Sequence, residues 1–160
     1  MKKIMLIIAG ALLVVSCSCN DKENTANTAL IEKYVQSVEA MDFDAMDSVL
    51  DESYMGFGPS INDSINKEQT VANWKFNVEN LYEAIKYKKS RNAPILIEDG
   101  GNQGDWVANW AELEITFKGS GESVTIWANT NYLIRDGKIV KSYSFYNEAD
   151  VLEQLGFSYY

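Results

Sequence analysis

The sequence predicts an α+β domain in which three helices come first and pack on one face of a curved antiparallel sheet. Apolar residues recur at intervals of three and four between Thr28 and Leu81, which is the period of amphipathic helices. From Ala84 onward the period falls towards two, which is typical of strands with one buried face. Helices followed by a run of strands favour an α+β arrangement over alternating βαβ units.

The three helices are expected between residues 28 and 81. Thr28 is predicted to cap the first helix and Asp42 to open a second, shorter one. A short strand at 54–57 is stopped by Gly58-Pro59, and a polar loop precedes a third helix from about Lys67. The apolar stripes of the three helices are, in order, Leu30, Ile31, Tyr34, Val35, Val38 and Met41; Phe43, Met46, Val49 and Leu50; and Val71, Trp74, Val78 and Leu81.

The second half of the chain is predicted to form the sheet. Residues 85–97 suggest one bent strand or two, because Pro94 lacks the N–H that a sheet ladder needs. Residues 105–118, 122–135 and 138–147 follow as three long strands, and Asp136-Gly137 is a strong signal for a type I′ hairpin. Residues 148–155 are expected to form a short terminal helix.

The first 16 residues have the parts of a secretory signal peptide. Lys2 and Lys3 precede an apolar stretch of about a dozen residues, too short to span a bilayer comfortably. Val14-Val15-Ser16-Cys17 resembles the lipobox of bacterial lipoproteins, which implies cleavage before Cys17 and lipidation of its thiol. Cys19 fits this pattern poorly, and a buried helix is the structural alternative. Acyl chains on Cys17 would anchor the protein stably to a membrane.

Residues 17–27 are predicted to be a polar tether between the lipid and a domain spanning 28–160. The run 20–23 is either a solvated linker or similar to the charged patch that directs some lipoproteins of the Bacteroidota to the cell surface. Ser18 is not the aspartate that retains enterobacterial lipoproteins in the inner membrane. The expected location is therefore the cell envelope, at the outer membrane.

Composition excludes several function classes. Removal of Lys2 and Lys3 with the signal peptide would change the net charge from −9 to −11, which argues against binding nucleic acid. The chain has no histidine, so catalytic His-Asp pairs and imidazole metal sites are impossible. Both cysteines lie before the predicted domain. We expect no cofactor and no metal.

The order of elements resembles the nuclear transport factor 2-like superfamily, which includes SnoaL-like polyketide cyclases and ketosteroid isomerases. The resemblance covers nearly all of residues 28–157. It rests on residues 31–35 of the first helix, the turn at 40–44, and the hairpin at 132–140, in that order and spacing. It implies a cone-shaped fold whose mouth admits a small molecule, and members of the superfamily often dimerise through the sheet.

The ketosteroid isomerase pattern tests for catalysis residue by residue. Tyr34 matches the hydrogen-bond donor on the first helix. The position of the carboxylate base, immediately before a proline, holds Gly58, and the nearest match to the second donor is Thr130. Glycine cannot accept a proton, so isomerase chemistry is not expected and no catalytic residue is assigned.

The superfamily register predicts which side chains line the pocket. The predicted lining is mostly apolar with several hydroxyls, which suits a neutral, partly apolar ligand. The same residues could instead simply fill the core. They are Tyr34, Tyr54, Trp74, Ala111, Leu113, Ala128, Thr130, Tyr132, Ser144 and Tyr146.

The opposite face of the sheet is predicted to carry Trp110, Trp127, Tyr143 and Phe145. A monomer would expose this aromatic surface to water, so a partner should cover it, and a homodimer is the preferred explanation. A register error of one residue would exchange the two faces.

Three functions fit these observations. The first is a non-catalytic, lipid-anchored domain that binds a small ligand or a protein partner. The second is a SnoaL-like enzyme that uses Tyr34 and an unidentified carboxylate. The third is a structural dimerising module with a filled cone.

Overall fold

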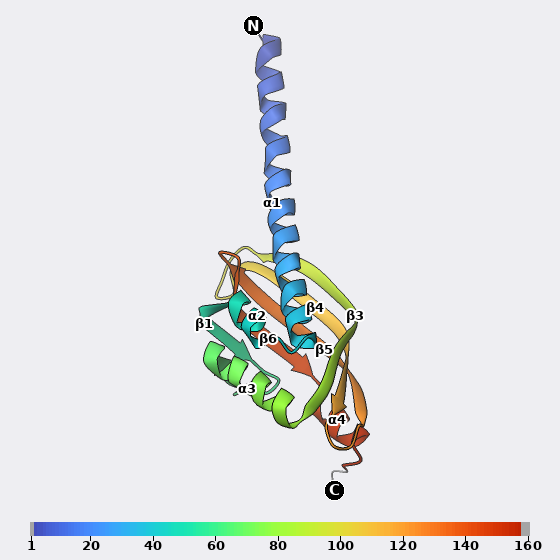
Figure 1. Ribbon diagram of the computed structural model, residues 1–160. Helices are drawn as coiled ribbons and strands as arrows, with labels where there is room; N and C mark the ends of the chain where they lie inside the picture. Colours follow the sequence, from blue (N-terminus) through green and yellow to red (C-terminus); the bar gives the residue numbers. More distant parts are fainter. Residues whose placement is uncertain (1, 158–160) are drawn as a thin grey trace.

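The structure, a computed structural model, describes residues 2–157, with side chains described for residues 21–157. Helices α1, α2 and α3 lie on one side of a curved sheet, and α1 projects well beyond the domain (Figure 1). The elements in chain order are α1 (Lys2–Glu39), α2 (Phe43–Val49), β1 (Leu50–Phe57), β2 (Ser64–Asn66), α3 (Lys67–Asn80), β3 (Tyr82–Ile97), β4 (Gly104–Phe117), β5 (Ser123–Arg135), β6 (Lys138–Tyr146) and α4 (Glu148–Gln154).

The sheet has six strands in the order β2-β1-β6-β5-β4-β3. The long strands β3 to β6 form the predicted antiparallel meander, with bounds within a residue or two of those expected for β4 to β6. The prediction of a purely antiparallel sheet is wrong in one respect, because β1 pairs with β6 in parallel. Parallel neighbours require a long crossover, and the chain between β1 and β6 supplies it.

Helix ends follow local capping chemistry. Asp42 accepts a hydrogen bond from the backbone N–H of Ala45 at 2.9 Å, as predicted for the start of α2. Asn66 and Gln69 form a reciprocal capping box at the start of α3, also with two bonds of 2.9 Å.

The first helix begins earlier than predicted. Helix α1 is continuous through Thr28, so Thr28 is not its cap. Residues 18–27 contain no glycine or proline and include good helix formers, which allows the helix to continue. Their role as a tether in the mature protein stays a prediction.

The strands differ from expectation where tertiary pairing decides the outcome. Strand β3 is one strand of 16 residues. It tolerates Pro94 because it lies at the edge of the sheet, and it bulges around Lys89, whose φ is 50°. Strand β2 pairs with β1 inside the segment expected to be a loop. Asp136 and Gly137 have φ angles of 50° and 70°, which confirms the type I′ turn.

The main core lies between α1, α2 and the helix-facing side of the sheet. Its apolar groups come from every strand except β2, so the helices and the sheet stabilise each other. The buried members are Ile31, Tyr34, Val35, Val38, Met46, Val49, Leu50, Tyr54, Ile85, Val107, Tyr132, Ile134 and Ile139.

Candidate functional site

Four tyrosines converge between the helices and the sheet, and we call them the tyrosine cluster: Tyr34 on α1, Tyr54 on β1, Tyr87 on β3 and Tyr132 on β5. The rings of Tyr34 and Tyr132 meet edge to face with centroids 5.7 Å apart. The hydroxyl of Tyr54 shares a hydrogen bond of 2.7 Å with the hydroxyl of Ser142 on β6. Three of the four side chains are almost wholly buried, and Tyr87 is partly so.

Burial keeps the cluster neutral. Desolvation is the largest cause that raises the pKa of Tyr34, Tyr54, Tyr87 and Tyr132 above the usual value, because a phenolate would lose its hydration there. Trp74 beside Tyr34 and Thr130 beside Tyr132 offset the pKa rise in part. At ordinary pH these phenols are hydrogen-bond donors and not bases.

A row of polar side chains crosses the helix-facing side of the sheet next to the cluster. The register aligns Asn92, Asn109, Thr130 and Ser144 across four adjacent strands. The amide nitrogen of Asn109 donates to Asn92 Oδ1 and to Ser90 Oγ, both at 2.8 Å, and the hydroxyls of Thr130 and Ser144 are 3.1 Å apart. Sequence reasoning missed Asn109. The signal that could have identified it is its place in the strand alternation, where this single amide lies between the apolar Val107 and Ala111.

Gly58 lies next to Ser144 on β6, at one end of this row. Its φ is +95°, and a Cβ atom there would lie 2.3 Å from the carbonyl oxygen of Ser144. Thr130 touches the same residue through its hydroxyl. The two positions that hold acid and base groups in the resembled isomerases therefore meet at Ser144, and neither has a titratable side chain in this chain.

The structure brings most of the predicted lining residues onto one side of the sheet. Strand pairing joins Ala111 to Ala128, Leu113 to Ile126, Thr130 to Ser144, and Tyr146 to Ala128. Trp74 reaches the same region from α3 and packs edge-on against Tyr82, with centroids 6.4 Å apart. Ala111 is wholly buried, whereas Tyr146 is exposed at the rim. A ligand-binding role for this surface stays a prediction.

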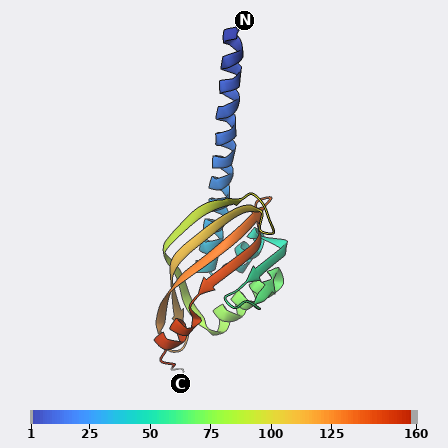
Figure 2. The same cartoon turned by 180° about the vertical axis from the view of Figure 1, so that it is seen from behind.

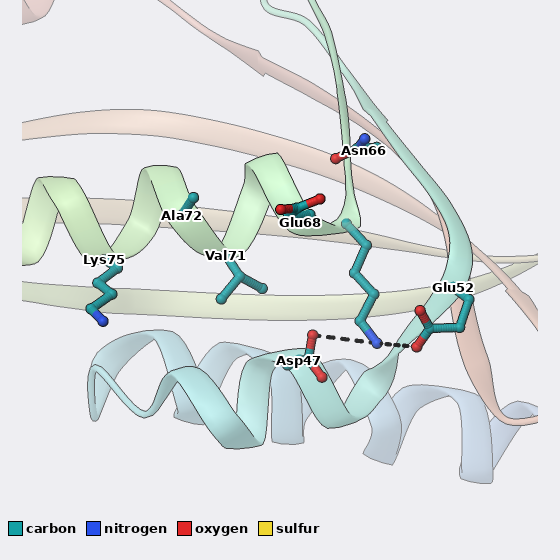
Figure 3. A pocket seen from close by; sticks show the side chains of 8 residues that line it. Asp47, Glu52, Asn66, Glu68, Val71, Ala72 and Lys75 are labelled. Carbon is teal, nitrogen blue, oxygen red and sulfur yellow. Dashed lines mark hydrogen bonds and ion pairs between the residues drawn. The ribbon is translucent and has the colours of Figure 1, made fainter.

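A surface hollow of about 550 Å³ lies elsewhere, between α2, β1 and α3 (Figure 3). Its central group is Lys67, whose ammonium lies 2.7 Å from Glu52 and 3.3 Å from Asp47. The hydrogen bond to Glu52 is the main cause that raises the pKa of Lys67. The sequence did not predict this hollow, because Lys67 was assigned only as a helix start. These ion pairs connect the first turn of α3 to α2 and β1.

Figure 2 shows the outward side of the sheet, on the face away from the helices. This side carries several exposed aromatic side chains. Trp110, Trp127 and Phe145 are 46%, 69% and 54% exposed. Tyr143 is different, because it is stacked between Phe57 and Trp106 within the same chain, at centroid distances of 5.1 and 6.0 Å. The exposed aromatic surface on this side is therefore formed mainly by the first three residues.

The side chain of Cys17, the predicted lipidation site, lies outside the part of the chain whose side chains are described. Among the described residues, none of the helices combines the length and the apolar composition needed to cross a membrane.

Comparison with solved structures finds the same architecture repeatedly. A proposed polyketide cyclase from Xanthomonas campestris pv. campestris superposes with a TM-score of 0.68 at 13% identity, covering 82% of this chain and 98% of that one. A proposed polyketide cyclase from a Silicibacter species gives 0.66 at 19%, covering 84% and 96%. A ketosteroid isomerase-like protein from Catenulispora acidiphila, solved with trimethylamine, gives 0.62 at 14%, covering 81% and 93%.

These likenesses define the class of fold. No protein-family model matches the sequence, and no curated protein matches it significantly. The chain has the nuclear transport factor 2-like fold, in the form found in SnoaL-like cyclases and ketosteroid isomerase-like proteins. At these identities the likeness shows the fold and not a shared activity.

Proposed function

We propose that this protein is a lipid-anchored domain of the cell envelope that binds a small neutral, partly apolar ligand without acid-base catalysis. One observation is its main support. Gly58 and Thr130, at the positions that supply the base and the second donor in the resembled enzymes, converge on Ser144 and leave the site without a titratable group there.

The chemistry of the surrounding side chains defines the ligand class. The tyrosine cluster offers neutral donors, because burial raises each phenol pKa. The paired hydroxyls of Thr130 and Ser144 use one hydrogen between them and keep another to donate. Apolar neighbours such as Leu113 complete the surface. An uncharged molecule with a hydrogen-bond acceptor suits this lining better than an ion.

Binding can be tested with a neutral solvatochromic dye, Nile red, followed by native mass spectrometry of protein purified from its own host. We expect saturable dye binding that Ala128→Leu weakens, because Ala128 is half-buried on the helix-facing side. The matched control is Trp127→Glu, which removes apolar surface from the opposite side of the sheet and should leave this binding intact.

The burial of three tyrosines supports an alternative, a structural module whose interior is filled by its own side chains. Tyr34, Tyr54 and Tyr132 are almost wholly buried, and the rings of Tyr34 and Tyr132 are in contact. If Ala128→Leu has no effect and no ligand co-purifies, the interior is filled and the protein is a structural module.

Lipid anchoring makes a direct prediction about Cys17. Cells fed a clickable fatty acid should label the wild-type protein, whereas Cys17→Ala should abolish labelling and release the protein from membranes, since no other cysteine fits the lipobox. Cys19→Ser is the matched control and should label normally. Equal labelling of wild type and Cys17→Ala would contradict the anchor. Fractionation of envelope membranes tests the proposed outer-membrane location.

The exposed aromatic side chains are proposed to form the contact between two copies of the chain. Trp127→Glu should convert a dimer to a monomer in light scattering, because it places a charge in a desolvated contact. Phe76→Glu is a suitable control, because Phe76 is 58% exposed on α3, away from the sheet. A wild type that is already monomeric at high concentration would refute the dimer.

A further inference from the structure

The edge strand β3 ends in a group of exposed apolar residues, Pro94, Ile95 and Leu96, which we call the apolar corner. Pro94, Ile95 and Leu96 are consecutive and all exposed, with Ile95 at 43% and Leu96 at 53%. Successive strand residues point to opposite faces, so the strand end is apolar on both of its sides. Isolated exposed apolar residues are ordinary, but three together on an unpaired edge require an explanation.

The corner lies at the end of the domain from which α1 projects. Strand β3 ends and β4 begins there, while α4 and the hairpin between β4 and β5 lie at the opposite end (Figures 1 and 2). A hollow of about 550 Å³ separates Pro94 from α1. Its helix side is lined by Asp21, Asn24, Thr25, Thr28, Ala29 and Glu32.

The start of the mature chain is therefore close to this corner. Only four residue steps separate Cys17 from Asp21, which lines the same hollow as Pro94. Four steps span at most about 14 Å when extended and about 6 Å when helical. The headgroup layer on each side of a bilayer is itself roughly 5–8 Å thick. A lipid on Cys17 therefore brings the membrane surface within reach of the corner.

We infer that Pro94, Ile95 and Leu96 rest in the headgroup and acyl boundary of the bilayer that holds Cys17. This inference depends on the lipid anchor in the proposed function. It fixes the orientation of the domain, with α4 and the hairpin between β4 and β5 directed away from the membrane. Three apolar side chains bind a bilayer weakly by themselves, but the anchor makes the contact intramolecular and raises its effective concentration.

Charge selects the kind of membrane. Asp21 and Glu32 line the hollow, and exposed Glu98 and Asp99 follow the strand end directly. These carboxylates would be repelled by an anionic lipid surface. The contact therefore suits a zwitterionic phospholipid layer.

The test uses the full chain, recovered lipidated from a bacterial host and reconstituted in phosphatidylcholine vesicles. All variants contain Cys19→Ser, so that an environment-sensitive fluorophore labels only an introduced thiol. The reporter is Glu98→Cys, next to the corner. Its matched control is Ser120→Cys, in the hairpin that lies roughly 40 Å away along β4. Both positions are exposed.

We expect the fluorophore at Glu98→Cys to shift to shorter wavelengths and to be quenched by a lipid-attached quencher, whereas the one at Ser120→Cys should stay in water. Adding Ile95→Ser and Leu96→Ser should remove most of the shift while vesicle binding persists. Identical signals from the two reporters, or a shift that survives the double substitution, would overturn the inference. Failure of the wild type to bind vesicles would instead refute the proposed anchor, and this contact with it.

Discussion

Gly58→Ala should lower the free energy of unfolding by about 3 kcal/mol, and Gly58→Asp by more. Gly58 has a φ of +95°, where an L-residue is strained by about 1–2 kcal/mol. Its new Cβ would also lie 2.3 Å from the carbonyl oxygen of Ser144, a backbone atom that cannot rotate away. Urea unfolding followed by circular dichroism measures the loss as a lower midpoint with an unchanged slope.

Gly100→Ala separates the two causes. Gly100 has a similar φ of +85°, but a Cβ there meets nothing within 4 Å. This variant should lose only the backbone part, about 1 kcal/mol. If both variants cost the same, the close approach of Gly58 to Ser144 is not present in solution.

This result bears on catalysis. A carboxylate at Gly58 would occupy space already taken by the backbone of β6, and would add the cost of desolvating a charge. The position that holds the base in the resembled isomerases therefore has no side chain in this protein, and the backbone of β6 leaves no room for one. A SnoaL-like enzyme built on this chain would need a base from some other position.

The sequence predicted most of the fold where local chemistry decides, although the predicted cap at Thr28 was wrong. The cap at Asp42, the start of α3 at Lys67, the turn at Asp136-Gly137 and the alternation of β4 to β6 are all set by near neighbours. Long-range pairing decided the rest. The parallel alignment of β1 with β6 cannot be inferred from the residues of β1, since either direction buries Leu50 and Tyr54.

The sequence predicted which side of the sheet carries the residues of the candidate site, but it did not predict how these residues pack against other elements. Alternation placed Ala128 and Thr130 on one side of the sheet, because strand period fixes the side, and the superfamily register added Ala111, which pairs with Ala128. It could not show that Gly58 approaches Ser144, that the bulge near Lys89 lies where Ser90 meets Asn109, or that Tyr143 stacks within its own chain. Each of these depends on the relative position of two elements that are distant in sequence.

Alkaline pH should unfold the protein cooperatively, roughly between pH 11 and 13. Unfolded tyrosines ionise near pH 10, whereas burial raises the pKa of all four phenols in the tyrosine cluster. Below pH 10 neither state loses these protons, so stability is unaffected. Above pH 10 the unfolded state releases protons that the folded state retains, and stability falls by about 1.4 kcal/mol per pH unit for each tyrosine. While all four phenols stay protonated in the folded state, they give at most roughly 5 kcal/mol per pH unit, enough to exhaust the stability of an ordinary domain within one to three units.

Tyr132→Phe provides the quantitative test. It keeps the ring that meets Tyr34 and removes one titrating group, so the slope of stability against pH above 10 should fall by about 1.4 kcal/mol per unit. Stopped-flow pH jumps should show the tyrosinate absorbance of the cluster rising together with the loss of helical circular dichroism. Ionisation of these four phenols in a chain that stays folded would mean that water enters the interior freely. That outcome would contradict the buried, neutral donor site on which the proposed ligand class depends.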